Sequence, residues 1–237
     1  MFSRAVTDYW LPDAVADAAT ATGEYRVLTD GSLPGGFSLM VLETSSGSRI
    51  LTLTPAQARL LGLTGVSTVG DPALRSALAA AGAALHGADY LFYLPAGDQA
   101  AVRAEPVPAE TRQLTAADAE AFGQFTAGAP AEDMDDAFVE LDHWLVMGTF
   151  ADGRLVSAAS MYRWRGTSFA DLGVITLPAY RGRGLAKRTV RAISARALAE
   201  GYEPQYRCQL GNTPSAWLAR AAGFVQFGTW DVIASGD

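Results

Sequence analysis

The stretch from Ile175 to Gly201, ITLPAYRGRGLAKRTVRAISARALAEG, constrains the fold of this chain most strongly. The segment Phe169–Thr176, which overlaps the first two residues of this stretch, is rich in β-branched and aromatic residues, a pattern that predicts a strand. After Gly184, a run of strong helix formers predicts a helix over 185–200, with Gly201 as its C-terminal stop. The sequence therefore predicts an apolar strand that passes through a glycine- and arginine-rich turn into a long helix.

The turn between this strand and helix predicts an anion-binding site. Arg181, Gly182, Arg183 and Gly184 precede a helix whose first backbone N–H groups have no intrahelical acceptor. The helix dipole adds partial positive charge there, and glycine lets a phosphate approach the backbone closely. The two arginines add full charges and bidentate donors. The alternative is a tight connection whose arginines are only solvated.

Two common nucleotide-binding motifs do not fit the turn. A dinucleotide fingerprint needs a third glycine where Lys187 stands, and a Walker loop needs a Gly-Lys-Ser/Thr ending that this turn lacks. Because the chain contains 24 glycines, a short glycine motif also arises easily by chance. The flanking sequence is therefore needed to interpret the turn.

The pattern Arg181-x-x-Gly184-x-Ala186, preceded by Pro178 and Tyr180, resembles the coenzyme A pyrophosphate loop of the GCN5-related N-acetyltransferase (GNAT) superfamily. The segment 206–224, YRCQLGNTPSAWLARAAGF, is similar to that family's fifth strand, Asn-x-x-Ser turn, short helix and Gly-Phe pair. The resemblance implies an α/β chain with a mixed sheet: a GNAT acyl-CoA N-acyltransferase fold at the C-terminus, after a smaller N-terminal α/β domain. The detailed spelling resembles the two-domain branch that includes zwittermicin A resistance protein.

Three segments of different character predict the domain organisation. Residues 1–105 are expected to form an N-terminal α/β domain, with a helix over 12–20 and short strands joined by hairpins. Residues 106–112 have the composition of a linker. Residues 113–237 cover the GNAT domain, with helices expected over 115–122 and 135–144 and a hairpin at Asp152-Gly153. Three roles stay open for the N-terminal domain: covering the acceptor cleft, pairing two chains as a homodimer, and acting as scaffold.

The charge balance limits the partners of the chain. Its 25 acidic and 18 basic residues give a formal net charge of −7, which disfavours nucleic acid and anionic membranes because both need a basic face. The N-terminus has no signal-like apolar region, and Cys208 is the only cysteine, so a cytoplasmic protein without disulfides is expected. No metal site is predicted, because neither His86 nor His143 has a ligand partner at helical spacing.

The resemblance implies acetyl-CoA as co-substrate. Its pantetheine arm would lie between the fourth and fifth strands and bond the fourth-strand backbone as an added strand does. Asn212 would contact the cofactor or order the crossover, and a capping role stays equally open for it, although Ser215 is another possible cap. The cofactor-binding residues predicted in this way are Val174, Ile175, Thr176, Leu177, Arg181, Gly182, Arg183, Gly184, Leu185, Ala186, Lys187, Asn212 and Ser215.

Acetyl transfer needs a deprotonated amine and a protonated or stabilised thiolate. Asp171 occupies the position where many family members have a catalytic glutamate, so the resemblance implies it as the base; a structural or substrate-positioning carboxylate is the alternative. Ala219 stands where the family often has a tyrosine acid, so the usual acid is absent. The acidic segment 131–142 falls where the family builds the acceptor cleft and would attract an ammonium group, unless it is only a solvated helix face.

Two classes of function follow. The first is an enzyme that moves acetyl from acetyl-CoA to a primary amine of a small molecule, with antibiotic or toxin detoxification as the role that the branch implies. The second is an acyl-CoA-binding sensor or interaction protein without turnover, which the alanine at position 219 suggests. Acetylation of proteins or peptides is a third possibility.

Overall fold

The structure, a computed structural model, describes residues 1–11, 23–31, 33, 36–164 and 166–234. The helix expected over 12–20 lies outside these residues. The contacts divide the chain into two units. The larger unit comprises Met1–Ala5, Phe92–Arg207 and Thr213–Val225, and the smaller unit comprises Val6–Leu91, Cys208–Asn212 and Gln226–Asp237.

The smaller unit contains strands in the order β4-β1-β3-β2-β11. β2 and β3 form the expected antiparallel hairpin, but β1 pairs in parallel with β3, so the hairpin expected between the first two strands is wrong. The reason is that the second edge of β2 is occupied by β11, which comes from the end of the chain. The strand bounds are β1 (Glu24–Thr29), β2 (Phe37–Thr44), β3 (Arg49–Leu53), β4 (Thr68–Gly70) and β11 (Val225–Ala234).

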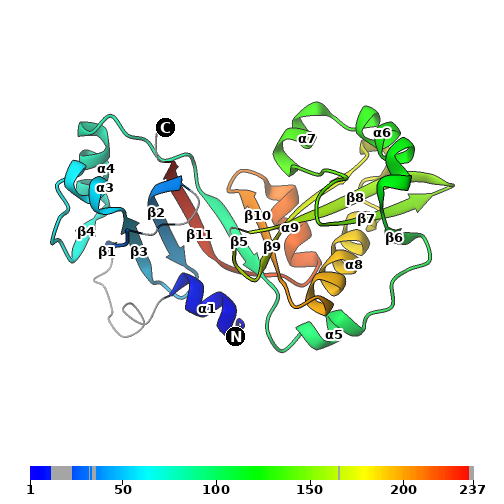
Figure 1. Cartoon of the computed structure of the whole chain (residues 1–237), viewed down its shortest axis with the longest axis horizontal. Helices are drawn as coiled ribbons and strands as arrows, with labels where there is room; N and C mark the ends of the chain where they lie inside the picture. Colours follow the sequence, from blue (N-terminus) through cyan, green and yellow to red (C-terminus); the bar gives the residue numbers. More distant parts are fainter. Residues whose placement is uncertain (12–22, 32, 34–35, 165, 235–237) are drawn as a thin grey trace. The chain divides into compact units, whose positions relative to one another are not determined.

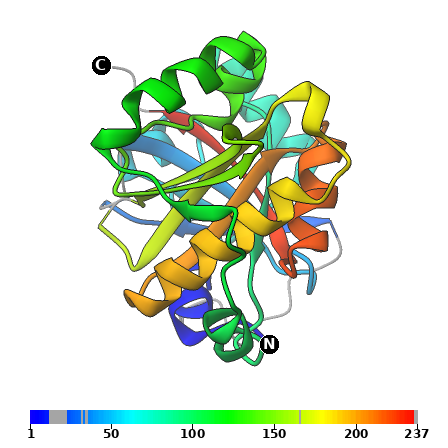
Figure 2. The ribbon, with the colours of Figure 1, turned by 90° about the vertical axis from the view of Figure 1, so that its right-hand side faces the viewer.

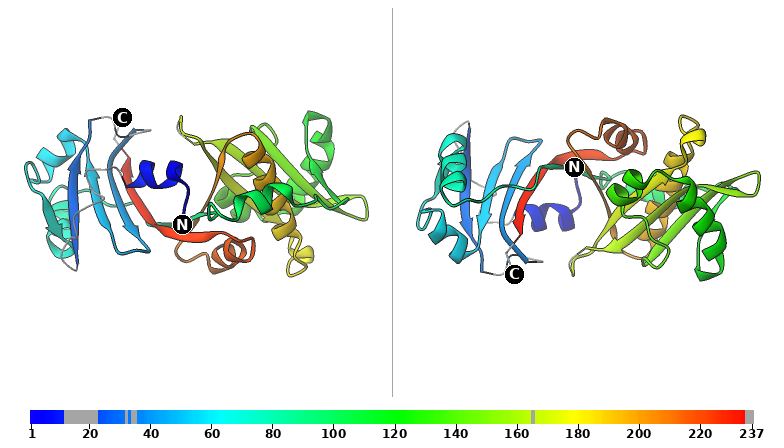
Figure 3. Two further views of the ribbon diagram at one scale, coloured as in Figure 1. Left: turned by 90° about the horizontal axis from the view of Figure 1, so that it is seen from below. Right: turned by 90° about the horizontal axis from the view of Figure 1, so that it is seen from above.

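Helices α3 (Pro55–Leu60) and α4 (Asp71–Ala80) lie together on one side of β1, β2 and β3 (Figure 3). α3 begins at Thr54, whose hydroxyl accepts the backbone N–H of Gln57 at 3.2 Å, as an N-cap does. Ala58 of α3 and the leucines of α4 join the strand residues Val27 and Leu51 in one buried cluster. Burial of this apolar surface holds the helices on the sheet. A further helix, α1 (Arg4–Trp10), brings the ring of Trp10 within 6.2 Å of that of Trp230.

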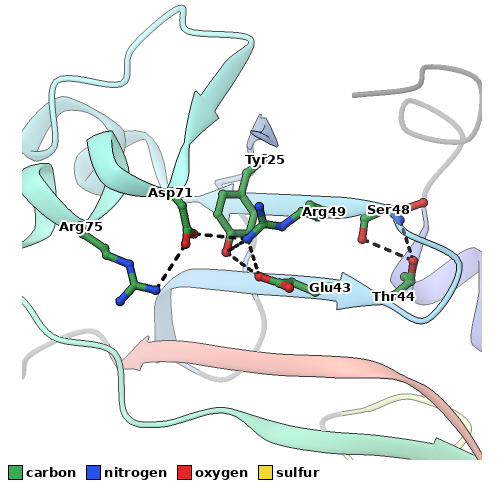
Figure 4. A network of polar contacts seen from close by, with 7 residues as sticks. All are labelled: Tyr25, Glu43, Thr44, Ser48, Arg49, Asp71 and Arg75. Carbon is green, nitrogen blue, oxygen red and sulfur yellow. Dashed lines mark hydrogen bonds and ion pairs between the residues drawn. The ribbon is translucent and has the colours of Figure 1, made fainter. Parts of the chain in front are cut away.

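A polar network crosses the strands of the smaller unit (Figure 4). Nη2 of Arg49 donates to Tyr25 Oη at 2.6 Å, to Glu43 Oε1 at 2.7 Å and to Asp71 Oδ1 at 3.2 Å. Arg75 Nη2 donates to the other oxygen of Asp71 at 3.3 Å. Burial, followed by hydrogen bonds to the two carboxylates, raises the pKa of Tyr25, so its hydroxyl stays protonated. The network ties β1, β2 and β3 to the start of α4.

The larger unit contains a mixed sheet with strands in the order β10-β9-β8-β7-β6, which confirms the predicted fold class. β6 to β9 are antiparallel neighbours, and β10 runs parallel to β9. Asp152 and Gly153 form the predicted turn between β7 and β8, with φ values of +50° and +78°. The bounds are β5 (Asp89–Tyr93), which leads into this unit, β6 (Thr111–Gln113), β7 (Leu145–Ala151), β8 (Arg154–Arg163), β9 (Phe169–Thr176) and β10 (Glu203–Gln209).

Helices cover both faces of this sheet. α6 and α7 lie on one side of β7 and β8, and α8 crosses the opposite side (Figures 1 and 2). α8 confirms the predicted long helix, because it ends at Ala199 and is followed by Gly201 with φ +84°. The remaining bounds are α5 (Gln99–Ala104), the 3-10 helix η2 (Ala116–Asp118), α6 (Ala119–Gly128), α7 (Ala131–Ala137), η3 (Pro178–Tyr180), α8 (Leu185–Ala199) and α9 (Thr213–Ala221).

The helix expected over 135–144 is wrong. α7 ends at Ala137, and Phe138 adopts the left-handed conformation with φ +48° and ψ +52°. This residue turns the chain away from the helix axis, so the segment between Phe138 and β7 is not helical. The Phe138 residue is exposed at this turn, with 51% of its surface accessible.

Candidate active site

β9 and β10 separate part of the way along their length. Their last paired residues are Leu172 and Tyr206, whereas β9 continues to pair with β8 as far as Thr176. Among the residues that the structure describes, the stretch from Gly173 to Thr176 therefore has a partner strand on only one side. This is the separation expected of the fourth and fifth strands of the fold.

The open edge of β9 presents backbone groups. The N–H of Leu177 bonds the carbonyl of Val156, just past the end of β9 on the β8 side. Because the direction of backbone groups alternates along a strand, the N–H and C=O of Val174 and Thr176 point away from β8 into the opening. The carbonyl of Thr176 indeed accepts a hydrogen bond from Arg181 Nε at 3.0 Å. Val174 is left able to bond an extended ligand.

The turn that follows β9 has the conformation of an anion cradle. Gly182 and Gly184 have φ values of +74° and +75°, and nothing lies within 4 Å of the position of a Cβ atom at either glycine. Gly184 is the N-cap of α8, and no side chain caps the helix. Within the described chain, the N–H groups of residues 182–187 form no backbone hydrogen bond. These amides lie in an exposed turn at the positive end of the helix dipole.

The cations around the turn differ in their partners. Arg181 forms an ion pair with Asp133 of α7, in addition to its bond to the Thr176 carbonyl. Arg183 Nη2 donates to the carbonyl of Ala179 at 3.1 Å, and its guanidinium lies 5.2 Å from the ring centre of Tyr180. Within the described residues, neither Arg183 nor the exposed Lys187 forms an ion pair with a carboxylate. Their charges are available to an anionic ligand.

Asp171, the base predicted from the sequence, is buried in a polar network, with 5% of its surface accessible. Its carboxylate accepts hydrogen bonds from Tyr162 Oη at 2.7 Å, from Gln205 Nε2 at 2.9 Å and from Arg207 Nη2 at 2.7 Å. Gln205 accepts in turn from Tyr93 Oη. The carboxylate thus links β8, β9 and β10. Both of its oxygens have donors, which suits a structural role, and its role as base stays a prediction.

The segment after β10 contains the last two predicted cofactor residues. Ser215 Oγ in α9 lies 2.9 Å from Tyr206 Oη. The N–H of Asn212 donates to the carbonyl of Gln209 at 3.0 Å, in the turn that precedes α9. Ala219 is completely buried, so the position of the family's usual acid has neither a proton donor nor contact with solvent. The roles of Asn212 and Ser215 towards a cofactor stay predictions.

His143 lies in a cluster that the sequence pattern did not single out as a site. Its Nδ1 atom is 2.8 Å from Ser160 Oγ on β8, and its Nε2 atom is 3.6 Å from a carboxylate oxygen of Glu140. Its ring centre lies 4.9 Å from that of Phe138 and 5.4 Å from that of Tyr162. Burial lowers the pKa of His143, and the carboxylates of Glu140 and Asp142 act in the opposite direction. No local spacing in the sequence predicts this cluster, because Ser160 lies on β8, 17 residues further along the chain.

Among the described residues, no three side chains of the types His, Cys, Asp or Glu come together as the ligands of a metal ion do. Among the same residues, no helix combines the length and the apolar character needed to cross a bilayer. Cys208 is a buried free cysteine.

Comparison with known proteins adds a family assignment to this geometry. A family model described as GNAT acetyltransferase matches residues 104–233, which is more than half of the chain. An acetyltransferase of the GNAT family from Colwellia psychrerythraea is 18% identical, with a TM-score of 0.50 over 82% of this chain and 80% of that chain. Its likeness supports the fold. No curated protein matches the chain.

Two further solved structures are similar at lower TM-scores. A GCN5-related N-acetyltransferase-like protein from Streptococcus suis is 17% identical, with a TM-score of 0.46 over 89% of this chain and 88% of that chain. The aminoglycoside N-acetyltransferase AAC(6′)-Iy, solved in complex with CoA, is 23% identical, with a TM-score of 0.39 over 49% of this chain and 92% of that chain.

Proposed function

The chain belongs to the GNAT acetyltransferase family, and on this premise we propose that it transfers the acetyl group of acetyl-CoA to a primary amine of a small molecule. The observation that carries the proposal is the turn at residues 182–187, where backbone N–H groups without backbone acceptors meet two glycines of positive φ. A pyrophosphate fits such a turn, because the amides supply donors and the absence of Cβ atoms allows close approach.

The residues around the turn fit the rest of acetyl-CoA. Arg183 and Lys187 would face the phosphates, and Leu185 and Ala186 contribute amides of the first helical turn. The pantetheine arm would extend along β9 and bond the backbone of Val174, which points into the opening. When bound, acetyl-CoA supplies the activated acetyl group, and the chain binds it, orients it and handles the proton of the amine.

The acceptor is proposed to be a cationic amine. The segment from α7 to β7 contains Glu132, Asp133, Asp135, Asp136, Glu140 and Asp142. α7, which contains the first four of these acids, packs against β9 at Gly173, where the opening begins. Their negative charge would raise the local concentration of an ammonium compound. Membership of the branch that includes zwittermicin A resistance protein, and with it a role in detoxifying an antibiotic or toxin, belongs to this proposal.

A second candidate function rests on the burial of Ala219. Because no side chain can protonate the departing thiolate from that position, an acyl-CoA-binding sensor or interaction protein without turnover is the alternative. Acetylation of a protein or peptide amine is a variant of the first function. It differs only in the size of the acceptor.

Two measurements test the proposal together. Isothermal titration calorimetry with acetyl-CoA measures binding, and release of CoA thiol with spermidine, tyramine, kanamycin, L-lysine or a lysine-containing peptide measures transfer. Binding together with amine-dependent thiol release supports the enzyme, and the acetylated product distinguishes small molecules from peptides. Binding without release from any of these amines favours the sensor, and no binding would overturn both functions.

A further inference from the structure

The reacting end of acetyl-CoA can be placed along β9, on the basis of the proposed function. With the pyrophosphate at residues 182–187, an extended pantetheine arm would run back along the open edge of β9 toward Gly173. From Leu177 to Gly173 this edge spans about 13 Å, at ~3.3 Å per residue, a length that suits the arm. Beyond Gly173 the Leu172 and Tyr206 pair closes the opening. The thioester would therefore lie near Gly173.

Two side chains that could accept a proton at pH 7 are candidates for the base, both on the α7 side of the sheet at this level. Asp171 is one, and its oxygens are already bonded by Tyr162, Gln205 and Arg207. His143 is the other. It contacts Ser160, which is the direct partner of Gly173 across the β8–β9 pair. Paired residues on antiparallel strands have Cα atoms about 5 Å apart, so His143 lies one strand away from the closed end of the opening.

The imidazole of His143 is held on several sides. Ser160 Oγ is 2.8 Å from Nδ1, and the same oxygen accepts the backbone N–H of Glu140 at 3.2 Å. The rings of Phe138 and Tyr162 pack against the imidazole. In the tautomer whose Nδ1–H donates to Ser160, the Nε2 atom has its lone pair available. The carboxylate of Glu140, 3.6 Å from Nε2, would stabilise a positive charge on the ring.

We propose that His143 is the general base of the acetyl transfer, positioned by Ser160 and Glu140, and that Asp171 is a structural carboxylate. The amine nitrogen attacks the thioester carbonyl carbon, a C–N bond forms, and Nε2 of His143 takes the proton that this nitrogen loses. The C–S bond then breaks. The imidazolium returns its proton to the leaving thiolate through solvent, so a separate acid is not required at Ala219.

Burial and the nearby charges set the pH at which His143 works. Glu140 and Asp142 face it from its own segment, and from β8 Tyr162 faces it with Asp171 and Arg207 behind. Burial has the largest effect and lowers the pKa of His143 below its ordinary 6.5. The imidazole is thus neutral and basic at pH 7, and its protonation should add an acidic limb to the kcat/KM profile at this lowered value, separate from the limb of the amine itself.

The test compares His143→Gln with wild type in the thiol-release reaction, using acetyl-CoA and whichever panel amine wild type acetylates fastest. We expect kcat/KM to fall by about 100-fold or more, the usual range for loss of a general base. The acidic limb that belongs to His143 should also disappear, while calorimetry gives an unchanged Kd for acetyl-CoA. Imidazole added to His143→Ala should restore part of the rate, a result that a structural role does not predict.

The chain offers a matched control in His86, its only other histidine, which is exposed in the smaller unit. His86→Gln should keep the wild-type rate and pH profile. Ser160→Ala should lower kcat with little change in KM and shift the acidic limb, and Ser160→Thr should restore both.

If wild type transfers acetyl but His143→Gln keeps both rate and acidic limb, His143 is not the base and the proposed function stands. If wild type neither binds acetyl-CoA nor releases thiol, both proposals fail.

Discussion

Arg207 on β10 and the buried Asp171 on β9 form an ion pair near the last point where these strands are joined, with the half-buried Arg207 Nη2 2.7 Å from Asp171 Oδ2. The guanidinium also lies 4.5 Å from the ring centre of Trp164. Directly beyond this level, from Gly173 onward, β9 has no partner on the β10 side within the described residues. The pair therefore fixes the closed end of the opening in which we place the pantetheine arm.

Asp171→Asn should lower the free energy of unfolding by about 3 kcal/mol, because it removes the buried carboxylate charge that pairs with the half-buried Arg207 guanidinium. Denaturation by urea measures this change. In the double variant with Arg207→Met, the decrease in the free energy of unfolding should be smaller than the sum of the two single decreases. Such a result would show that the two residues are coupled. A variant of unchanged stability whose acetyl transfer is abolished would instead support Asp171 as the base.

Gly184→Val should weaken acetyl-CoA binding at least 10-fold, or about 1.4 kcal/mol. The added side chain would occupy the open space over the amides where the pyrophosphate is placed, and valine is strained at a φ of +75°. Calorimetry gives the Kd. Gly153→Val is the matched control, since Gly153 has φ +78° and open space but lies in the β7–β8 hairpin. Equal affinity of wild type and Gly184→Val for acetyl-CoA would show that the turn is not part of the cofactor site.

Features set by neighbouring residues could be predicted from the sequence. The strand Phe169–Thr176, the turn with its two glycines and the helix that ends before Gly201 depend on propensity and on backbone conformation over a few residues. The same is true of Asp152-Gly153, where both residues adopt the positive φ that a two-residue hairpin needs.

Features that depend on strand order could not be predicted in this way. Asp171 meets Arg207 and Gln205 only because β10 lies beside β9, and His143 meets Ser160 only across β7 and β8. The early end of α7 has a similar cause. Its last carbonyl, that of Ala137, lies directly over Gly173, a contact with no trace in the local pattern around Phe138.

Gly173→Ala should destabilise the larger unit by about 2 kcal/mol, within the range for overpacking of a filled site. A Cβ atom at this position would overlap the carbonyl oxygen of Ala137 and crowd Val139, so α7 must move away from β9. Chemical denaturation gives the stability, and thiol release should fall because the segment that holds His143 is displaced.

The control for this variant is Gly123→Ala in α6, where an added Cβ meets nothing within 4 Å. Alanine in an open helical position should leave stability equal or slightly higher. If Gly173→Ala behaved like the control, the close packing of α7 on β9 would be refuted.

Glu203→Gln should raise the melting temperature by a few degrees at pH 8 and by little at pH 4. Glu203 is buried at the start of β10, where burial is the main cause of its raised pKa and Gln99 Nε2 donates to it at 2.8 Å. Because folding raises this pKa, the carboxyl group stabilises the fold most at a pH below its ordinary pKa of 4.5. This stabilisation is lost as the pH rises through the pKa of the folded state. Glutamine keeps an acceptor for Gln99 without the charge. Scanning calorimetry from pH 4 to 8 measures the difference, and Glu120→Gln, at an exposed position, is the control that should change the melting temperature little. A glutamine variant at position 203 that became less stable with rising pH would show that the charge itself stabilises this end of β10.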